Sequence, residues 1–121
     1  MTNLREIFLR RNKVSSLPRE LSRLKQLECV YLEDNQLTDD GIPSSLTALQ
    51  AMTGITLQRN RLTRVPDPIL FWRQLEELHV DGNNIELLPD AVCDLVQLRE
   101  LGISNNRIRR LPRELGRLVD L

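Results

Sequence analysis

One pattern of eleven residues recurs along the chain and constrains its fold more than any other feature of the sequence. Each copy has apolar residues at its first, fourth, sixth and eleventh positions and asparagine at its ninth, as in Leu4-x-x-Ile7-x-Leu9-x-x-Asn12-x-Val14. The spacing between copies is constant, except that the second copy is longer by two. A unit this short cannot enclose a core by itself, so the sequence predicts a stack of similar coils around a shared core. The five copies begin at Leu4, Leu27, Met52, Leu75 and Leu98, and Leu121 stands where a sixth would begin.

The first part of each copy predicts a short strand with one buried face. Apolar residues occupy every second position there, which is the spacing of a strand that packs on one side. In the first copy Ile7 and Leu9 are expected to point inward, whereas Phe8 points outward. The asparagine that follows is expected to turn inward, where its amide can donate and accept hydrogen bonds in its own coil and in the adjacent one. The resulting structural ladder comprises Asn12, Asn35, Asn60, Asn83 and Asn106.

The second part of each copy predicts a short helix or 3-10 turn. Apolar residues are three apart there, as at Leu21 and Leu24, and a preceding proline fits the first turn of a helix. Trp72 falls in the inward column of these helices, and Phe71 lies one position over. Strands stack about 4.8 Å apart but helices need roughly 8–10 Å, so the stack must bend with its parallel sheet on the concave face. The two extra residues of the second copy fall within residues 38–41 and predict an outward bulge.

The repeat resembles the leucine-rich repeat family in its 23-residue intracellular form. The shared feature is an apolar residue followed by proline after each asparagine: Leu17-Pro18, Ile42-Pro43, Val65-Pro66, Leu88-Pro89 and Leu111-Pro112. In this spacing the chain is similar to Ras-pathway scaffold proteins and plant intracellular Ras-group repeat proteins. The resemblance implies a right-handed α/β solenoid of five repeats, in a single domain over residues 1–121. The repeats would span residues 4–26, 27–51, 52–74, 75–97 and 98–120, without capping segments, as in a fragment of a longer array.

Charge and composition argue against several classes of partner. The chain holds 17 basic and 17 acidic residues, so it lacks the basic excess that binding to nucleic acid or to an anionic membrane surface requires. No apolar run approaches the roughly 20 residues of a membrane span. The two cysteines, Cys29 and Cys93, do not form a disulfide framework, and no glycosylation sequon occurs. These features favour a cytoplasmic location.

The zero net charge conceals an alternation between coils. The net charge is +5 over residues 1–26, −5 over 27–51, +3 over 52–74, −6 over 75–97 and +3 over 98–121. Neighbouring coils therefore attract each other, which favours the in-register stack over slipped arrangements.

Catalytic chemistry is not expected. One histidine cannot form a two-histidine metal site, and the five glycines are scattered rather than gathered in a phosphate-binding loop. An open sheet also offers no enclosed cavity in which pKa values would shift. The sequence therefore predicts no enzyme, no cofactor and no metal site.

The outward residues of the predicted sheet are the most informative surface. Phe8 and Tyr31 are two of only four aromatic residues, and the repeat makes them neighbours on the open concave face. Aromatic and arginine side chains dominate protein-binding hot spots. Cross-strand stacking that only stabilises the sheet is the competing interpretation. The predicted partner-binding patch comprises Phe8, Arg10, Arg11, Tyr31 and Arg59, with Glu33, Asp34, His79 and Asp81 at its edges.

The leading functional hypothesis is a protein–protein interaction module or scaffold that binds its partner on the concave sheet. The resemblance to Ras-pathway scaffolds implies a small GTPase or a phosphatase complex as the class of partner. One alternative is a recruiting or sensing segment of a larger signalling enzyme, such as a kinase or ubiquitin ligase, and another is a structural spacer without a partner. Because the predicted ends lack caps, end-to-end self-association is also expected.

Overall fold

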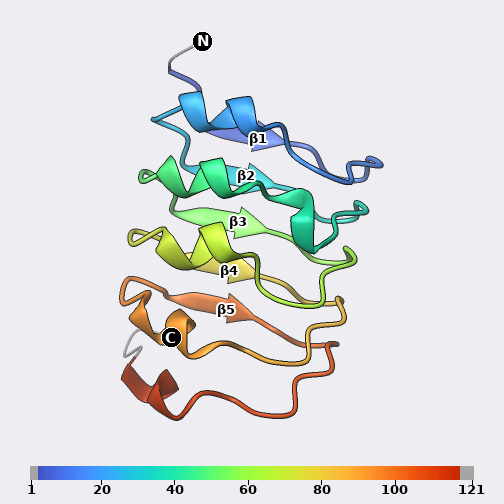
Figure 1. Ribbon diagram of the computed structural model, residues 1–121, viewed down its shortest axis with the longest axis vertical. Helices are drawn as coiled ribbons and strands as arrows, with labels where there is room; N and C mark the ends of the chain where they lie inside the picture. Colours follow the sequence, from blue (N-terminus) through green and yellow to red (C-terminus); the bar gives the residue numbers. More distant parts are fainter. Residues whose placement is uncertain (1–2, 118–121) are drawn as a thin grey trace.

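Residues 3–117 are described by the computed structural model, and over this range strands of a parallel sheet alternate with 3-10 helices (Figure 1). The strands are β1 Glu6–Phe8, β2 Cys29–Tyr31, β3 Gly54–Thr56, β4 Glu77–His79 and β5 Glu100–Gly102. The 3-10 helices are η1 Arg19–Arg23, η2 Asp39–Gly41, η3 Ser44–Ala48, η4 Asp67–Phe71, η5 Asp90–Asp94 and η6 Arg113–Arg117. Leu121, the expected start of a sixth copy, lies outside the described residues.

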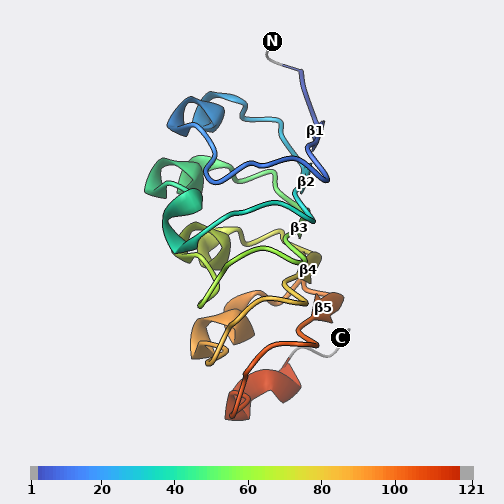
Figure 2. The same ribbon diagram turned by 90° about the vertical axis from the view of Figure 1, so that its right-hand side faces the viewer.

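The sheet follows sequence order, from β1 to β5, and each neighbouring pair of strands is parallel. Equivalent positions of successive copies lie directly opposite each other, as Ile7, Val30 and Ile55 do. Figure 2 shows the strands along one side of the stack and the 3-10 helices along the other, with the helical side bowed outward. The predicted fold class, a solenoid with a parallel sheet on its concave side, is therefore confirmed.

Short 3-10 helices, rather than α-helices, carry the chain across the outer side of the coils. In the first coil Pro18 precedes η1 in an extended conformation, and the Leu24 N–H donates to the Leu21 carbonyl at 3.0 Å, which closes a three-residue turn. A tight helix of this kind occupies few residues, so the short repeat suffices for one full coil. Within residues 3–117, the helices are too short and too polar to cross a membrane.

The inward columns of the coils form one continuous core. Val30 and Ile55, at the centres of β2 and β3, are at most 2% exposed. Ile7 and Leu9 point inward as predicted, but they remain half-buried because β1 is an edge strand of the sheet. Burial is therefore most complete in the middle coils.

Trp72 fills the core behind η4, as the sequence predicts. It is 1% exposed, and its Nε1–H donates to the buried Leu46 carbonyl of the preceding coil at 2.8 Å. Phe71, one position away, is 51% exposed on the helical side of the stack. A single step along the chain thus separates a core aromatic residue from a surface one.

The asparagines lie beneath the turn that follows each strand and link neighbouring coils. The Asn60 Oδ1 accepts a hydrogen bond from the Leu37 N–H at 2.9 Å, and its Nδ2 donates to the Leu32 and Leu57 carbonyls at 3.0 Å each. Leu32 and Leu37 belong to the preceding coil, so one side chain joins two coils. The same bonds recur around Asn35, Asn83 and Asn106. Asn12, in the first coil, is exposed and donates within that coil.

The extra length of the second coil lies in a short 3-10 helix, η2. The Asp39 carboxylate at the start of η2 accepts hydrogen bonds from the Thr63 N–H (2.8 Å), the Thr63 hydroxyl and the Arg64 N–H (3.3 Å). Partial burial raises the pKa of Asp39, but these hydrogen bonds lower its pKa by more. The insertion therefore ties the second coil to the third.

Ion pairs follow the alternation of charge between coils. Among residues 3–117, four arginine–carboxylate pairs join neighbouring coils: Arg5–Glu28 (3.8 Å), Arg10–Glu33 (3.5 Å), Arg59–Asp34 (2.5 Å) and Arg99–Glu76 (3.9 Å). Exposed pairs of this kind contribute little to stability individually. A slipped stack would instead bring like charges together, so the pairs favour the observed register.

Candidate protein-binding surface

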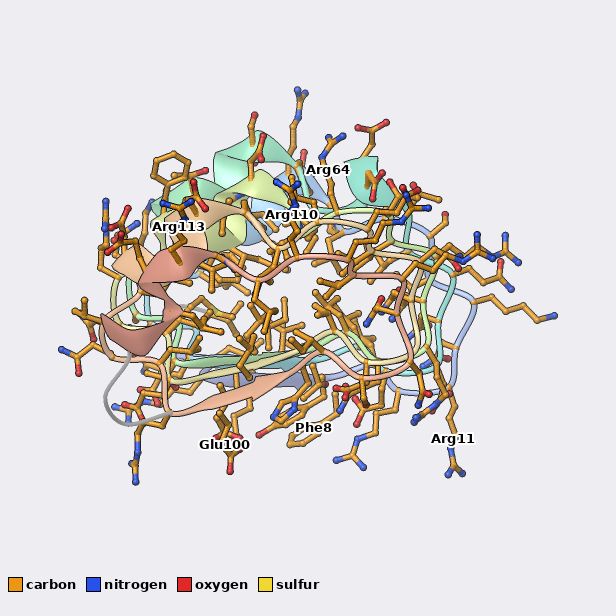
Figure 3. The ribbon with its side chains drawn as sticks, turned by 90° about the horizontal axis from the view of Figure 1, so that it is seen from below. Phe8, Arg11, Arg64, Glu100, Arg110 and Arg113 are labelled. Atoms are coloured by element: carbon orange, nitrogen blue, oxygen red, sulfur yellow. The ribbon has the colours of Figure 1, made fainter. Side chains whose placement is uncertain are left out.

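Two stacked aromatic rings project from the concave face of the sheet at β1 and β2. Phe8 lies directly opposite Tyr31 in the strand register, and their ring centroids are 4.7 Å apart with an interplanar angle of 5°. This separation matches the spacing of about 4.8 Å between paired strands, so the register itself sets the stack. Phe8 is 59% exposed, and Figure 3 shows it projecting from the sheet on the side away from the 3-10 helices.

Arg10 lies beside both rings. Its guanidinium carbon is 6.0 Å from the centroid of the Phe8 ring and 5.5 Å from that of Tyr31, within the range of cation–π attraction. The Arg10 Nε also pairs with Glu33 at 3.5 Å, and Glu33 in turn accepts a hydrogen bond from the Thr56 hydroxyl at 2.7 Å. We call Phe8, Arg10 and Tyr31 the aromatic platform. The ion pair with Glu33 of the next coil holds the Arg10 guanidinium in place.

The Tyr31 hydroxyl remains a hydrogen-bond donor at neutral pH. Burial, and then the neighbouring Cys29, raise the pKa of Tyr31 above its ordinary value. The negative charges of nearby Glu6 and Glu77 also raise the pKa of Tyr31. The platform therefore offers apolar ring faces, one guanidinium and one phenolic donor.

Three other residues of the predicted patch lie in the turns after the strands. Asp34 accepts hydrogen bonds from Arg59 Nε and Nη2 at 2.5 and 3.0 Å, and these bonds hold the pKa of Asp34 below its usual value. Arg11, Asp34 and Arg59 all have positive φ, between 56° and 62°. Arg11 projects from the edge of the sheet, apart from Phe8 (Figure 3). Of these three turn residues, Arg11 is thus the one seen to lie apart from the aromatic platform.

The last two residues of the predicted patch lie on the other half of the sheet. Asp81 accepts hydrogen bonds from the Ser104 N–H and hydroxyl, at 3.2 and 2.6 Å. The Nε2 of His79 lies 3.7 Å from Glu77 Oε1 and 3.5 Å from Glu100 Oε2. A hydrogen bond with Glu100 raises the pKa of Glu77, and burial adds to the effect.

Sequence reasoning missed this grouping of an imidazole with two carboxylates. The signal was present, because Glu77 and His79 are two apart on one strand and Glu100 follows Glu77 by one period of the repeat. Two positions apart on a strand means the same face, and one period means the opposite position on the next strand. A search for pairs of histidines, or for acidic residues adjacent in sequence, does not reveal a combination that spans two strands.

Solved structures of known proteins share the architecture. A Leptospira interrogans LRR protein matches with a TM-score of 0.83 and 27% identity, covering 91% of this chain and 28% of that one. An internalin from Listeria monocytogenes matches with a TM-score of 0.83 and 25% identity, covering 99% of this chain and 33% of that one.

Curated relatives match over about two thirds of the chain. They include the probable inactive serine/threonine-protein kinase roco10 of Dictyostelium discoideum, which is 35% identical over 69% of this chain and 3% of its own length. Human podocan-like protein 1 is 38% identical over 69% of this chain and 16% of its own length. Plant intracellular Ras-group-related LRR protein 8 of Oryza sativa is 31% identical over 65% of this chain and 21% of its own length. The chain thus spans only 3% to 21% of these relatives. The sequence pattern described as "Leucine rich repeat" matches residues 44–108, more than half of the chain, which therefore belongs to the leucine-rich repeat family.

Proposed function

We propose that the chain is a protein-binding module that docks its partner on the aromatic platform of the concave sheet. Leucine-rich repeat domains in general bind proteins. The observation that carries the location is the 59% exposure of Phe8, whose ring is nevertheless held flat against Tyr31. Covering this ring with a partner removes apolar surface from water, which is favourable by about 25 cal/mol per Å².

The platform is also ordered before a partner arrives. The stack and the Arg10–Glu33 pair fix the side chains, so little conformational entropy remains to be lost on binding. Cross-strand stacking by itself stabilises a sheet by about 0.5–1.5 kcal/mol. The fold does not require aromatic residues in this column, however, because Thr56 and Gly102 occupy it in β3 and β5. Partner binding accounts for a feature that the fold does not need.

The proposal is tested by quantitative affinity capture from a cell lysate with three forms of the protein. The wild type is compared with the double variant Phe8→Ala/Tyr31→Ala and with Phe71→Ala, which removes a similarly exposed phenylalanine from the helical side. We expect the double variant to lose a set of proteins that the wild type and Phe71→Ala retain. If all three forms retain the same proteins, and the free energy of unfolding falls only in the double variant, then the rings stabilise the sheet and do not bind a partner.

We further propose that the protein acts as a cytoplasmic scaffold and that its partner is a small GTPase or a phosphatase complex. The Leu-Pro step of the repeat and the match to a plant intracellular Ras-group-related protein support this assignment. The matched relatives also include extracellular proteins, the keratocans and podocans. Binding assays with a purified small GTPase in its GDP and GTP states test the partner class, and cell fractionation tests the location.

A second candidate function is a recruiting or sensing segment of a larger signalling enzyme. The observation that favours it is the match to the probable inactive kinase roco10. The aligned region makes up only 3% of the length of roco10. The full-length transcript distinguishes the two proposals. A catalytic domain in the same reading frame supports the recruiting segment, whereas further repeats alone support the scaffold.

A further inference from the structure

The strand register brings three side chains together at one point of the concave face. Glu77 on β4 lies directly opposite Glu100 on β5, and His79 follows Glu77 on the same face. The ligand atoms, Glu77 Oε1, His79 Nε2 and Glu100 Oε2, all lie within 4.8 Å of one another. Figure 3 shows Glu100 projecting from the same face of the sheet as Phe8. The cluster therefore opens to the solvent on the concave side.

The separations match those of ligands around a tetrahedral metal ion. Zinc binds imidazole nitrogen at about 2.0–2.1 Å and carboxylate oxygen at about 2.0–2.2 Å, which places tetrahedral ligands roughly 3.3–3.5 Å apart. The observed distances from His79 Nε2 are 3.5 Å to Glu100 and 3.7 Å to Glu77. Both distances from the imidazole are within a few tenths of an ångström of the tetrahedral values, and the two carboxylates lie within 4.8 Å of each other. Magnesium, by contrast, prefers oxygen ligands in an octahedral arrangement, so the imidazole favours the zinc class.

The negative charges of the two glutamates also favour the binding of a cation. Like charges directly opposite each other on neighbouring strands are destabilising. Among the ion pairs of the described residues, Glu77 and Glu100 pair only with His79, while the adjacent Arg99 pairs with Glu76. A divalent ion bound between Glu77 and Glu100 would offset the repulsion between the two carboxylates.

A third carboxylate, that of Asp81, lies near the other ring nitrogen of the imidazole. A β-carbon at Gly102 would approach Asp81 Oδ1 and, at 2.9 Å, His79 Nδ1, so both atoms lie over this glycine. The hydrogen bonds from Ser104 hold the Asp81 carboxylate there. Metal-binding histidines usually direct their other ring nitrogen toward a carboxylate or carbonyl, which leaves the first nitrogen free to coordinate. Asp81 Oδ1 thus lies on the Nδ1 side of the ring, whereas Nε2 faces the two glutamates.

We propose that Glu77, His79 and Glu100 bind one divalent transition-metal ion of the zinc class on the concave face. The three side chains supply three tetrahedral positions, and the fourth faces solvent and takes water or a donor atom from another molecule. This site does not depend on the proposed partner or on the aromatic platform.

The test is a zinc titration of the whole chain without a histidine tag, in the presence of a non-thiol reductant. His79 is the only histidine, so the imidazole nitrogen resonances in NMR report on this site alone. We expect one zinc per chain, with the Nε2 resonance shifting on binding and magnesium producing no such shift. Cys29→Ser should bind zinc as the wild type does, because the thiol is not a ligand.

Variants complete the test. His79→Gln and Glu77→Gln/Glu100→Gln should weaken zinc binding by more than about tenfold, since even changes around the ligands cost about 10–100-fold. Glu76→Gln, which removes a neighbouring carboxylate from outside the cluster, should bind as tightly as the wild type. An Nε2 resonance that stays unchanged at saturating zinc would overturn the proposal. Equal weakening by Glu76→Gln would also overturn it, because binding would then reflect general negative charge.

Discussion

Replacing Asn60 with alanine removes one side chain that links two coils. The Leu32 and Leu57 carbonyls each keep a second amide donor, from Asn35 and Asn83. The Leu37 N–H, by contrast, donates to Asn60 Oδ1 in the interior and would be left unpaired. An unpaired buried donor costs about 1–3 kcal/mol, and the void adds to this cost. We therefore expect Asn60→Ala to lower the free energy of unfolding by about 2–3 kcal/mol.

Urea unfolding followed by circular dichroism measures this loss. Asn12→Ala is the matched control, because Asn12 is exposed and donates only to carbonyls of its own coil among the described contacts. Its loss should be below about 0.5 kcal/mol. An unchanged slope against urea shows that the variants unfold as the wild type does. Equal losses for Asn60→Ala and Asn12→Ala would refute the role assigned to the coil-to-coil bonds.

Four further variants test other features of the fold. Because hydrogen bonds lower the pKa of Asp39 in the folded state, its contribution is present above the unfolded pKa and is lost as the pH falls through the folded value. Asp39→Asn should therefore be less stable than the wild type at pH 7, and thermal melts should show this gap closing below about pH 4. Gly41→Ala places a β-carbon 2.8 Å from the Ser15 carbonyl oxygen and should cost about 1–3 kcal/mol in urea unfolding. Gly54→Ala meets nothing closer than 3.5 Å and should be neutral or stabilising by up to about 1 kcal/mol, so equal losses at both glycines would contradict the packing described. Trp72→Phe should lower stability by about 1–2 kcal/mol through the lost indole hydrogen bond, and an unchanged melting temperature would show that this bond contributes nothing.

The period of the sequence determines most of the fold. The constant spacing of the repeat places Phe8 opposite Tyr31 and gives each strand its inward and outward positions. The alternation of apolar residues predicts which side chains are buried, as Val30 and Ile55 confirm. These features are predictable because they depend on position within the repeat and not on the identity of individual neighbours.

Features that depend on one particular neighbour could not be predicted in the same way. The extra residues of the second coil form η2 because Asp39 finds donors at Thr63 in the next coil. Arg11 has the residue type of a binding patch, but the turn after the strand directs it away from the rings. The grouping of His79 with two carboxylates requires side-chain geometry across two strands. Each of these outcomes is set by contacts between coils that a single repeat does not encode.

The aromatic platform carries the proposed function, and NMR of its two rings in solution tests it most directly. Tyr31 is the only tyrosine, and the Phe71→Ala variant leaves Phe8 as the only phenylalanine, so the ring protons of both residues can be assigned. A stack with centroids 4.7 Å apart predicts nuclear Overhauser contacts between the two rings and ring-current shifts of their protons. Ring protons at random-coil positions, without contacts between Phe8 and Tyr31, would contradict a platform that is ordered before its partner binds.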